Sequence, residues 1–134
     1  MKIAVIISLL VLGLGHMNPK TDATLNGTWQ PVKEEFGGKP WPAAMFENQK
    51  LVIADSLYTF YAESVDKGRV TYGDGKMDIY GMEGVNTGKH FMAIYKHEDG
   101  QLTICYNLKG DGYPEAFATK PQTMLFLSVF KKAE

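Results

Sequence analysis

The strongest constraint on the fold is a series of short, β-like segments separated by turn residues, which continues almost to the end of the chain. These segments are rich in β-branched and aromatic residues, which favour strands. The clearest hairpin signal is Asp99-Gly100 between two of them, because both residues tolerate the positive φ of a tight turn. Many short strands at this spacing predict a sandwich or a meandering barrel. We expect strands over residues 27–35, 50–54, 57–63, 68–72, 76–80, 89–97, 101–107, 115–119 and 124–131.

Alternation along these segments predicts which side chains face the interior. Apolar and polar residues alternate in most of them, so one face of each strand is expected inside. The expected inward pairs are Leu51 and Ile53, Val70 and Tyr72, Met77 and Ile79, and Ile104 and Tyr106. The last segment is apolar on both faces, so its outer face needs a cover. We expect either the one short helix of the chain, over residues 42–49, or a partner chain to supply it.

The first residues have the layout of a secretory signal peptide. A lysine is followed by an apolar run and then by Gly13-Leu14-Gly15, a small-x-small pattern at which a signal peptidase could cut. The run is shorter than the ~20 residues that span a membrane. We therefore predict a signal peptide over 1–15, a flexible leader over 16–24 and one folded domain over 25–132. The alternatives are a buried first strand or helix and an uncleaved membrane anchor.

Composition excludes several classes of function. The 134 residues carry 14 Lys plus Arg against 15 Asp plus Glu, so no basic stripe indicates nucleic-acid binding. The chain has a single arginine, Arg69, which lowers the odds of a site built for anionic ligands. One cysteine, Cys105, cannot form an internal disulfide, and with three scattered histidines it offers no zinc-ligand spacing. We expect no metal and no cofactor.

Several short motifs, in order along the chain, resemble one family. They are Leu25-Asn26-Gly27-Thr28-Trp29, Gly38-Lys39-Pro40, the block 100–105 (GQLTIC), Pro114-Glu115-Ala116-Phe117 and Val129-Phe130-Lys131-Lys132. The chain resembles small uncharacterised domains that are abundant in planctomycete genomes and are often described as lipocalin-like. The resemblance spans residues 25–132 and implies an exported, antiparallel meander β-barrel of about eight strands. It also implies a structural role for Gly27 and Trp29, with the tryptophan closing the bottom of the barrel.

The chain departs from that family at a few positions. Tyr113 stands where the family often has arginine before the proline, and Lys131-Lys132 stands where it often has Lys-Arg. Lipocalins commonly pack a late arginine over the first-strand tryptophan, and no arginine follows Arg69. We expect Lys131 to take that place through a cation–π contact.

The barrel interior is the first candidate for a site. A barrel of this size either fills its interior with side chains or holds one small ligand. The sequence is compatible with both of these interiors. The aromatic residues expected inside are Phe60, Tyr72, Tyr95, Tyr106 and Phe117. Trp41 lies between two prolines on a Gly-rich stretch and is expected to be a lid, a plug or a contact for a protein partner. Cys105 is expected to be a structural residue in mid-strand.

No catalytic constellation stands out in the sequence. His90 and His97 lie seven residues apart on one expected strand, so they point to opposite faces. The expected function is therefore an exported, non-enzymatic binding domain for a small, mainly apolar ligand. The alternative is a protein-interaction or structural module of the cell envelope with a filled barrel. An enzyme that uses one of these histidines is a third class.

Overall fold

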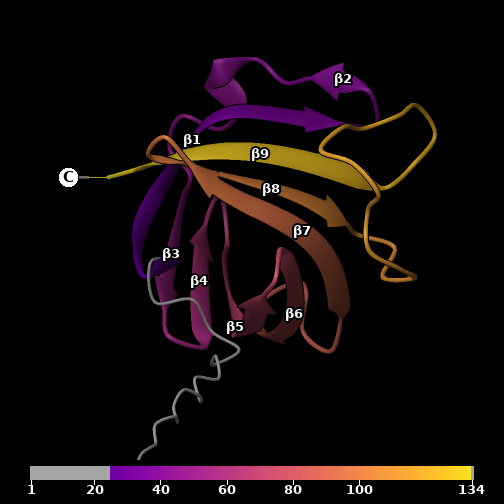
Figure 1. Ribbon diagram of the computed structural model, residues 1–134. Coiled ribbons are helices and arrows are strands. Elements are labelled where there is room, and N and C mark those ends of the chain that lie inside the picture. The colour runs from indigo at the N-terminus through magenta and orange to yellow at the C-terminus, as the bar shows by residue number, and fades with distance from the viewer. Residues whose placement is uncertain (1–24, 134) are drawn as a thin grey trace, which may run out of the picture.

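A computed structural model describes residues 25–133 of the protein. These residues form an all-β closed barrel (Figure 1). The proposed signal peptide 1–15 and leader 16–24 lie outside the described residues. The strands are β1 (Gly27–Phe36), β2 (Lys39–Pro40), β3 (Lys50–Ala54), β4 (Leu57–Tyr61), β5 (Val65–Gly73), β6 (Lys76–Glu83), β7 (His90–Glu98), β8 (Gln101–Asn107) and β9 (Leu125–Lys132).

The strands form an antiparallel meander whose two ends meet. Each strand from β3 to β8 pairs with the next one along the chain, β1 pairs with β3, and β1 also pairs with β9. The last pairing closes a barrel of eight strands, which confirms the predicted fold class. The short β2 lies outside this ring and extends the far end of β1. Closure leaves no long sheet edge free for pairing with other chains.

Most expected strands are present, within a few residues of their predicted bounds. The tight turns use the expected chemistry, since Asp74-Gly75 and Asp99-Gly100 both adopt positive φ angles. Two predictions are wrong. The segment 115–119 is not a strand but part of a long loop, 108–124, between β8 and β9. The expected short helix is a single 3-10 turn, Ala43–Met45.

The interior is packed by the alternating residues that the sequence indicates. All the expected inward pairs belong to the buried core except Tyr106, which is half-buried and packs against it. Because the side chains of a strand alternate between faces, these pairs set the register of every hairpin in the barrel.

One end of the barrel is closed around Trp29. Its side chain is fully buried, and its indole N–H donates a hydrogen bond to the carbonyl oxygen of Leu25, 2.9 Å away. The ring of His97 meets it edge-on at 5.4 Å. The Nζ atom of Lys132 lies 4.9 Å from the centre of the tryptophan ring. The expected cation–π contact is therefore made by Lys132 and not by Lys131.

Part of the outer face of β8 and β9 is covered by the 108–124 loop, and not by the expected short helix. The Sγ atom of Cys105 points outward and contacts the carbonyl oxygen of Ala118 at 3.7 Å. The hydroxyl of Thr119 bonds the carboxylate of Glu35 on the outer side of β1 and accepts a hydrogen bond from the backbone N–H of Gly38 at 2.8 Å. Cys105 is fully buried, and Figure 1 shows the loop at the ends of β8 and β9 that it joins.

Candidate functional site

The barrel contains a cavity of about 230 Å³ between its core and the end opposite Trp29. The cavity is below the roughly 300 Å³ at which typical ligand pockets begin, so any occupant is small. Its walls are mainly apolar, and its polar groups are few. The lining residues are Glu34, Leu51, Ile53, Tyr58, Phe60, Asp66, Val70, Met77, Ile79, Asn86, Phe91, Ile104, Tyr106, Leu108, Phe126, Ser128 and Phe130.

A β-bulge in β1 places a carboxylate inside this cavity. Pro31 pairs with Phe130 of β9 and Lys33 pairs with Val129, so Val32 is the extra residue on β1. A bulge shifts the alternation of side chains by one position. Glu34, which would otherwise face solvent, therefore faces the interior opposite Ser128, and it is only 1% exposed.

The Glu34 carboxyl group has no adequate hydrogen-bond partner among the described residues. Both of its oxygens are buried without a partner, and so is the hydroxyl oxygen of Ser128. The two side chains lie close together, but not in the geometry of a hydrogen bond. Burial raises the pKa of Glu34 from 4.5 to about 7, and the nearby Ser128 hydroxyl opposes this shift only in part.

Besides Glu34 and Ser128, the polar side chains that line the cavity are Tyr58, Asp66, Asn86 and Tyr106. Burial raises the pKa of Tyr106, and the charge of Glu34 raises it further. Burial and then the charge of Asp66 raise the pKa of Tyr58. Asp66 itself accepts a long hydrogen bond, 3.4 Å, from the backbone N–H of Asn86. Glu34 is therefore the acid of the cavity that lacks a partner.

The expected aromatic set is only partly brought together. Phe60 and Tyr106 line the cavity. Tyr72 and Tyr95 point into the barrel but pack edge-to-face against each other at 5.8 Å in the core, away from the cavity walls. Phe117 is on the 108–124 loop, where the Nζ atom of Lys96 lies 4.8 Å from its ring on the outer side. Its expected inward position was wrong because the segment that carries it is not a strand.

Trp41 belongs to the rim of the barrel and does not line the cavity. It is half-buried, and its ring lies 5.3 Å from that of Phe126 and 6.2 Å from that of Phe36. Its backbone N–H donates a hydrogen bond to the carbonyl oxygen of Glu34 at 2.9 Å. Since Phe126 does line the cavity, Trp41 supports one wall of the site from behind.

Sequence reasoning missed Glu34 and Ser128. Simple alternation from Trp29 puts Lys33 inside and Glu34 outside, and the bulge reverses this. The available signal was Pro31, because proline within a strand is found mostly at edges and bulges. A polar Ser128 between Phe126 and Phe130 on one face of the last strand was a second signal.

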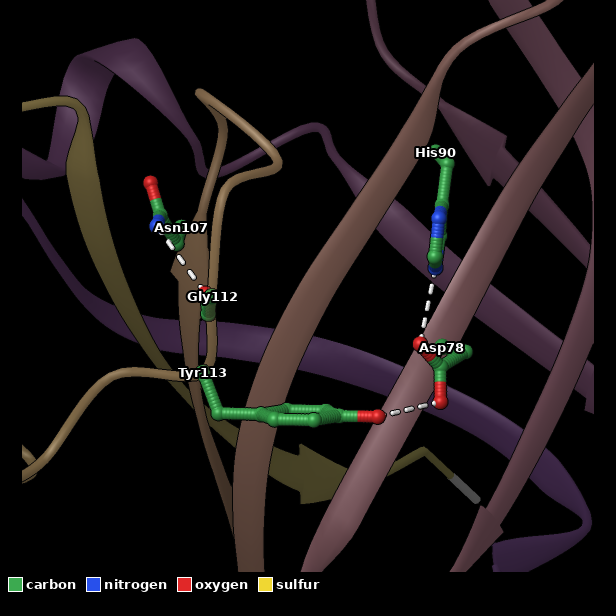
Figure 2. A network of polar contacts seen from close by, with 5 residues as sticks. All are labelled: Asp78, His90, Asn107, Gly112 and Tyr113. Carbon is green, nitrogen blue, oxygen red and sulfur yellow. Dashed lines mark hydrogen bonds and ion pairs between the residues drawn. The ribbon is translucent and has the colours of Figure 1, made fainter.

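A second cluster of polar groups lies on the outer surface (Figure 2). Asp78 on β6 contacts the Nε2 atom of His90 on β7 at 2.7 Å and accepts a hydrogen bond from the Tyr113 hydroxyl, also at 2.7 Å. This hydrogen bond to Asp78 raises the pKa of Tyr113. Nearby, Asn107 donates a hydrogen bond to the carbonyl oxygen of Gly112 at 2.9 Å. These bonds fasten the start of the 108–124 loop to the barrel wall.

Other chemistry finds little support in the part of the chain described. Within residues 25–133, no three His, Cys, Asp or Glu side chains are grouped so that they could hold a metal ion. Burial raises the pKa of the Cys105 thiol, which disfavours the reactive thiolate. Across the same residues, no helix is long and apolar enough to cross a membrane.

Comparison with known proteins adds no relative. The chain matches no family model, no curated protein and no solved structure.

Proposed function

We propose that this protein is an exported, non-enzymatic, lipocalin-like binding domain that takes a small, mainly apolar ligand inside its barrel. The observation that carries the proposal is the cavity of about 230 Å³ in a barrel of this size. Its walls are mostly aliphatic and aromatic, with a few polar groups, which is the usual make-up of a small-molecule site. Export rests on the signal-like residues 1–15 and on the resemblance to the lipocalin-like family.

Exposed apolar side chains near the same end of the barrel also support the proposal. Met45, Met82, Val85 and Met124 are each about half exposed or more, and all lie on or beside the connections opposite the Trp29 end. A ligand with low solubility in water would meet apolar surface before it entered.

The second candidate is a protein-interaction or structural module of the cell envelope. The same exposed methionines and Val85 favour it, because apolar surface also suits a protein partner. Its expected filled barrel does not agree with a cavity of this volume, so we rank it below ligand binding.

Native mass spectrometry of the full chain, recovered gently from the cells that make it, tests the proposal. We expect a bound small-molecule mass that is lost on denaturation. Val70→Phe adds bulk to a cavity wall and should abolish it. Val32→Phe is the matched control, because Val32 is 42% exposed on the bulge of β1. A clean apo mass in the wild type, or equal retention by both variants, would count against ligand binding.

A further inference from the structure

The cavity contains an uncompensated polar site. The two carboxylate oxygens of Glu34 and the hydroxyl oxygen of Ser128 are buried side by side on neighbouring strands without hydrogen-bond partners. Burial of a carboxyl group in apolar surroundings is costly unless it is paired. Leucine or valine at residue 34 would avoid that cost. What the Glu34 carboxylate lacks is a hydrogen-bond donor that reaches its two oxygens.

The charges of the cavity indicate which donor would fit. No lysine, arginine or histidine is among the lining residues. The titratable groups that share the cavity with Glu34 are Tyr58 on β4, Asp66 on β5 and Tyr106 on β8. None of these three side chains can carry a positive charge, so the cavity has carboxyl and hydroxyl groups but no cationic side chain. An anionic ligand would meet like charge in a low dielectric, whereas a cation would be attracted.

The volume limits the rest of the molecule. An apolar protein cavity of about 150 Å³ holds one benzene molecule. The cavity here, about 230 Å³, therefore has room for one ring with a short chain. Phe60, Phe91 and Phe126 offer aromatic contacts for such a body.

We propose that the ligand is a small amphiphilic amine, with its apolar body among the cavity aromatics and its protonated amino group on the Glu34 carboxylate beside Ser128. This inference rests on the proposed binding function and specifies its ligand class. An ammonium group donates up to three hydrogen bonds, which matches the three unpaired oxygens of Glu34 and Ser128.

Binding of such an amine depends on pH. The amine stays protonated to about pH 9, while Glu34 must lose its proton to pair with it. With a pKa of about 7 in the empty protein, Glu34 is mostly ionised at about pH 8 and mostly neutral at about pH 5.5. Affinity should therefore fall by up to roughly 30-fold between these two values as the pH decreases. A neutral ligand of the same shape should show no such loss.

The experiment is a calorimetric titration of the full-length chain with four probes of similar size. These are 2-phenylethylamine, 2-phenylethanol, propylbenzene and 3-phenylpropionate, each measured at about pH 5.5 and about pH 8. Glu34→Gln keeps the shape of the side chain and removes its charge. Glu35→Gln is the matched control, because it removes the same charge from the next residue, on the outer face of the same strand.

We expect the amine to bind at least ten-fold more tightly than the alcohol at about pH 8. Glu34→Gln should remove both this preference and its pH dependence, and Glu35→Gln should keep them. Propylbenzene should bind the wild type and both variants alike, which also shows that Glu34→Gln is folded.

The two proposals fail in distinguishable ways. If propylbenzene binds and the amine gains nothing over the alcohol, the cavity is a binding site but the amine inference is wrong. If 3-phenylpropionate is preferred, the inference is also wrong, because the site then selects an anion. If none of the four probes binds at either pH, the proposed binding function fails, and the inference fails with it.

Discussion

Two acidic residues of this barrel, Glu34 and Asp78, have opposite surroundings. Asp78 lies on the outer wall, partly exposed, with both carboxylate oxygens bonded to His90 and Tyr113 (Figure 2). Glu34 lies on the inner wall, is almost fully buried, and has a hydrogen-bond partner for neither oxygen. Because solvent reaches Asp78, its ion pair and hydrogen bond contribute little to the stability of the fold. Glu34 is buried without a hydrogen-bond partner, and this destabilises its charged form.

This difference indicates different roles. The contacts of Asp78 join β6, β7 and the 108–124 loop, so its network accounts for its presence as part of the fold. No contact of Glu34 explains its presence in the same way. Glu34 is therefore the residue with which the proposed amine ligand would pair.

The largest expected effect is on stability as a function of pH. Because the pKa of Glu34 is raised from 4.5 to about 7 on folding, the folded protein holds this proton more tightly than the unfolded chain. The protonated Glu34 therefore favours the folded state at low pH, and this contribution to stability is lost as the pH rises through 7. Between about pH 5 and about pH 8 the free energy of unfolding should fall by about 2 to 3 kcal/mol on this account. Urea unfolding at both pH values measures the fall.

Glu34→Gln isolates the contribution of the inner acid. The variant should lose most of this pH-dependent fall, while Asp78→Asn should keep it, because the two substitutions remove the same charge from the two sides of the wall. If the free energy of unfolding falls equally with pH in the wild type and in Glu34→Gln, then Glu34 is not an isolated buried acid.

A smaller effect is expected at the neighbour of Glu34. Ser128→Ala removes the one polar group that opposes the raised pKa of Glu34, so that pKa should move above 7. A carbon-detected NMR titration of the Glu34 carboxyl group reports the pKa directly. An unchanged or lower value would mean that the hydroxyl does not act on the carboxylate.

The smallest effect is expected on the outer wall. Asp78→Asn should cost no more than about 1 kcal/mol, because the network is partly exposed to solvent. The pKa of Tyr113, raised by its hydrogen bond to Asp78, should fall toward its ordinary value of 10. Alkaline titration of the tyrosinate absorbance detects this change. Asp74→Asn, in the β5–β6 turn, is the control and should leave Tyr113 unaffected.

The fold was predictable because the relevant signals are local. Alternation over five to nine residues fixed the inner faces of β3, β5, β6 and β8, and Asp-Gly pairs marked tight turns between them. The long loop was missed because 115–119 has strand-like residues. The segment lies between Pro114 and Pro121, and neither proline has a backbone N–H that could donate a hydrogen bond to a neighbouring strand.

The site was less predictable because it depends on a single extra residue. With Val32 bulged out, every later side chain of β1 changes face, and Glu34 joins the cavity. Such a shift leaves composition and hydropathy unchanged, so the only signals in the sequence are Pro31 and the polar Ser128 on the facing strand. The cavity is the space that side chains from all eight barrel strands leave unfilled, and no single segment of the sequence predicts it.

The pairing of β1 with β9 also has a consequence for how the chain reaches its final state. The barrel is sealed by its first and last described strands, which are about a hundred residues apart, so the β1–β9 seam consists of contacts of high sequence separation, which are slow to form. A nascent chain whose β9 is still in the ribosome has an open sheet. The pairing of β9 with β1 is therefore the step that closes the barrel.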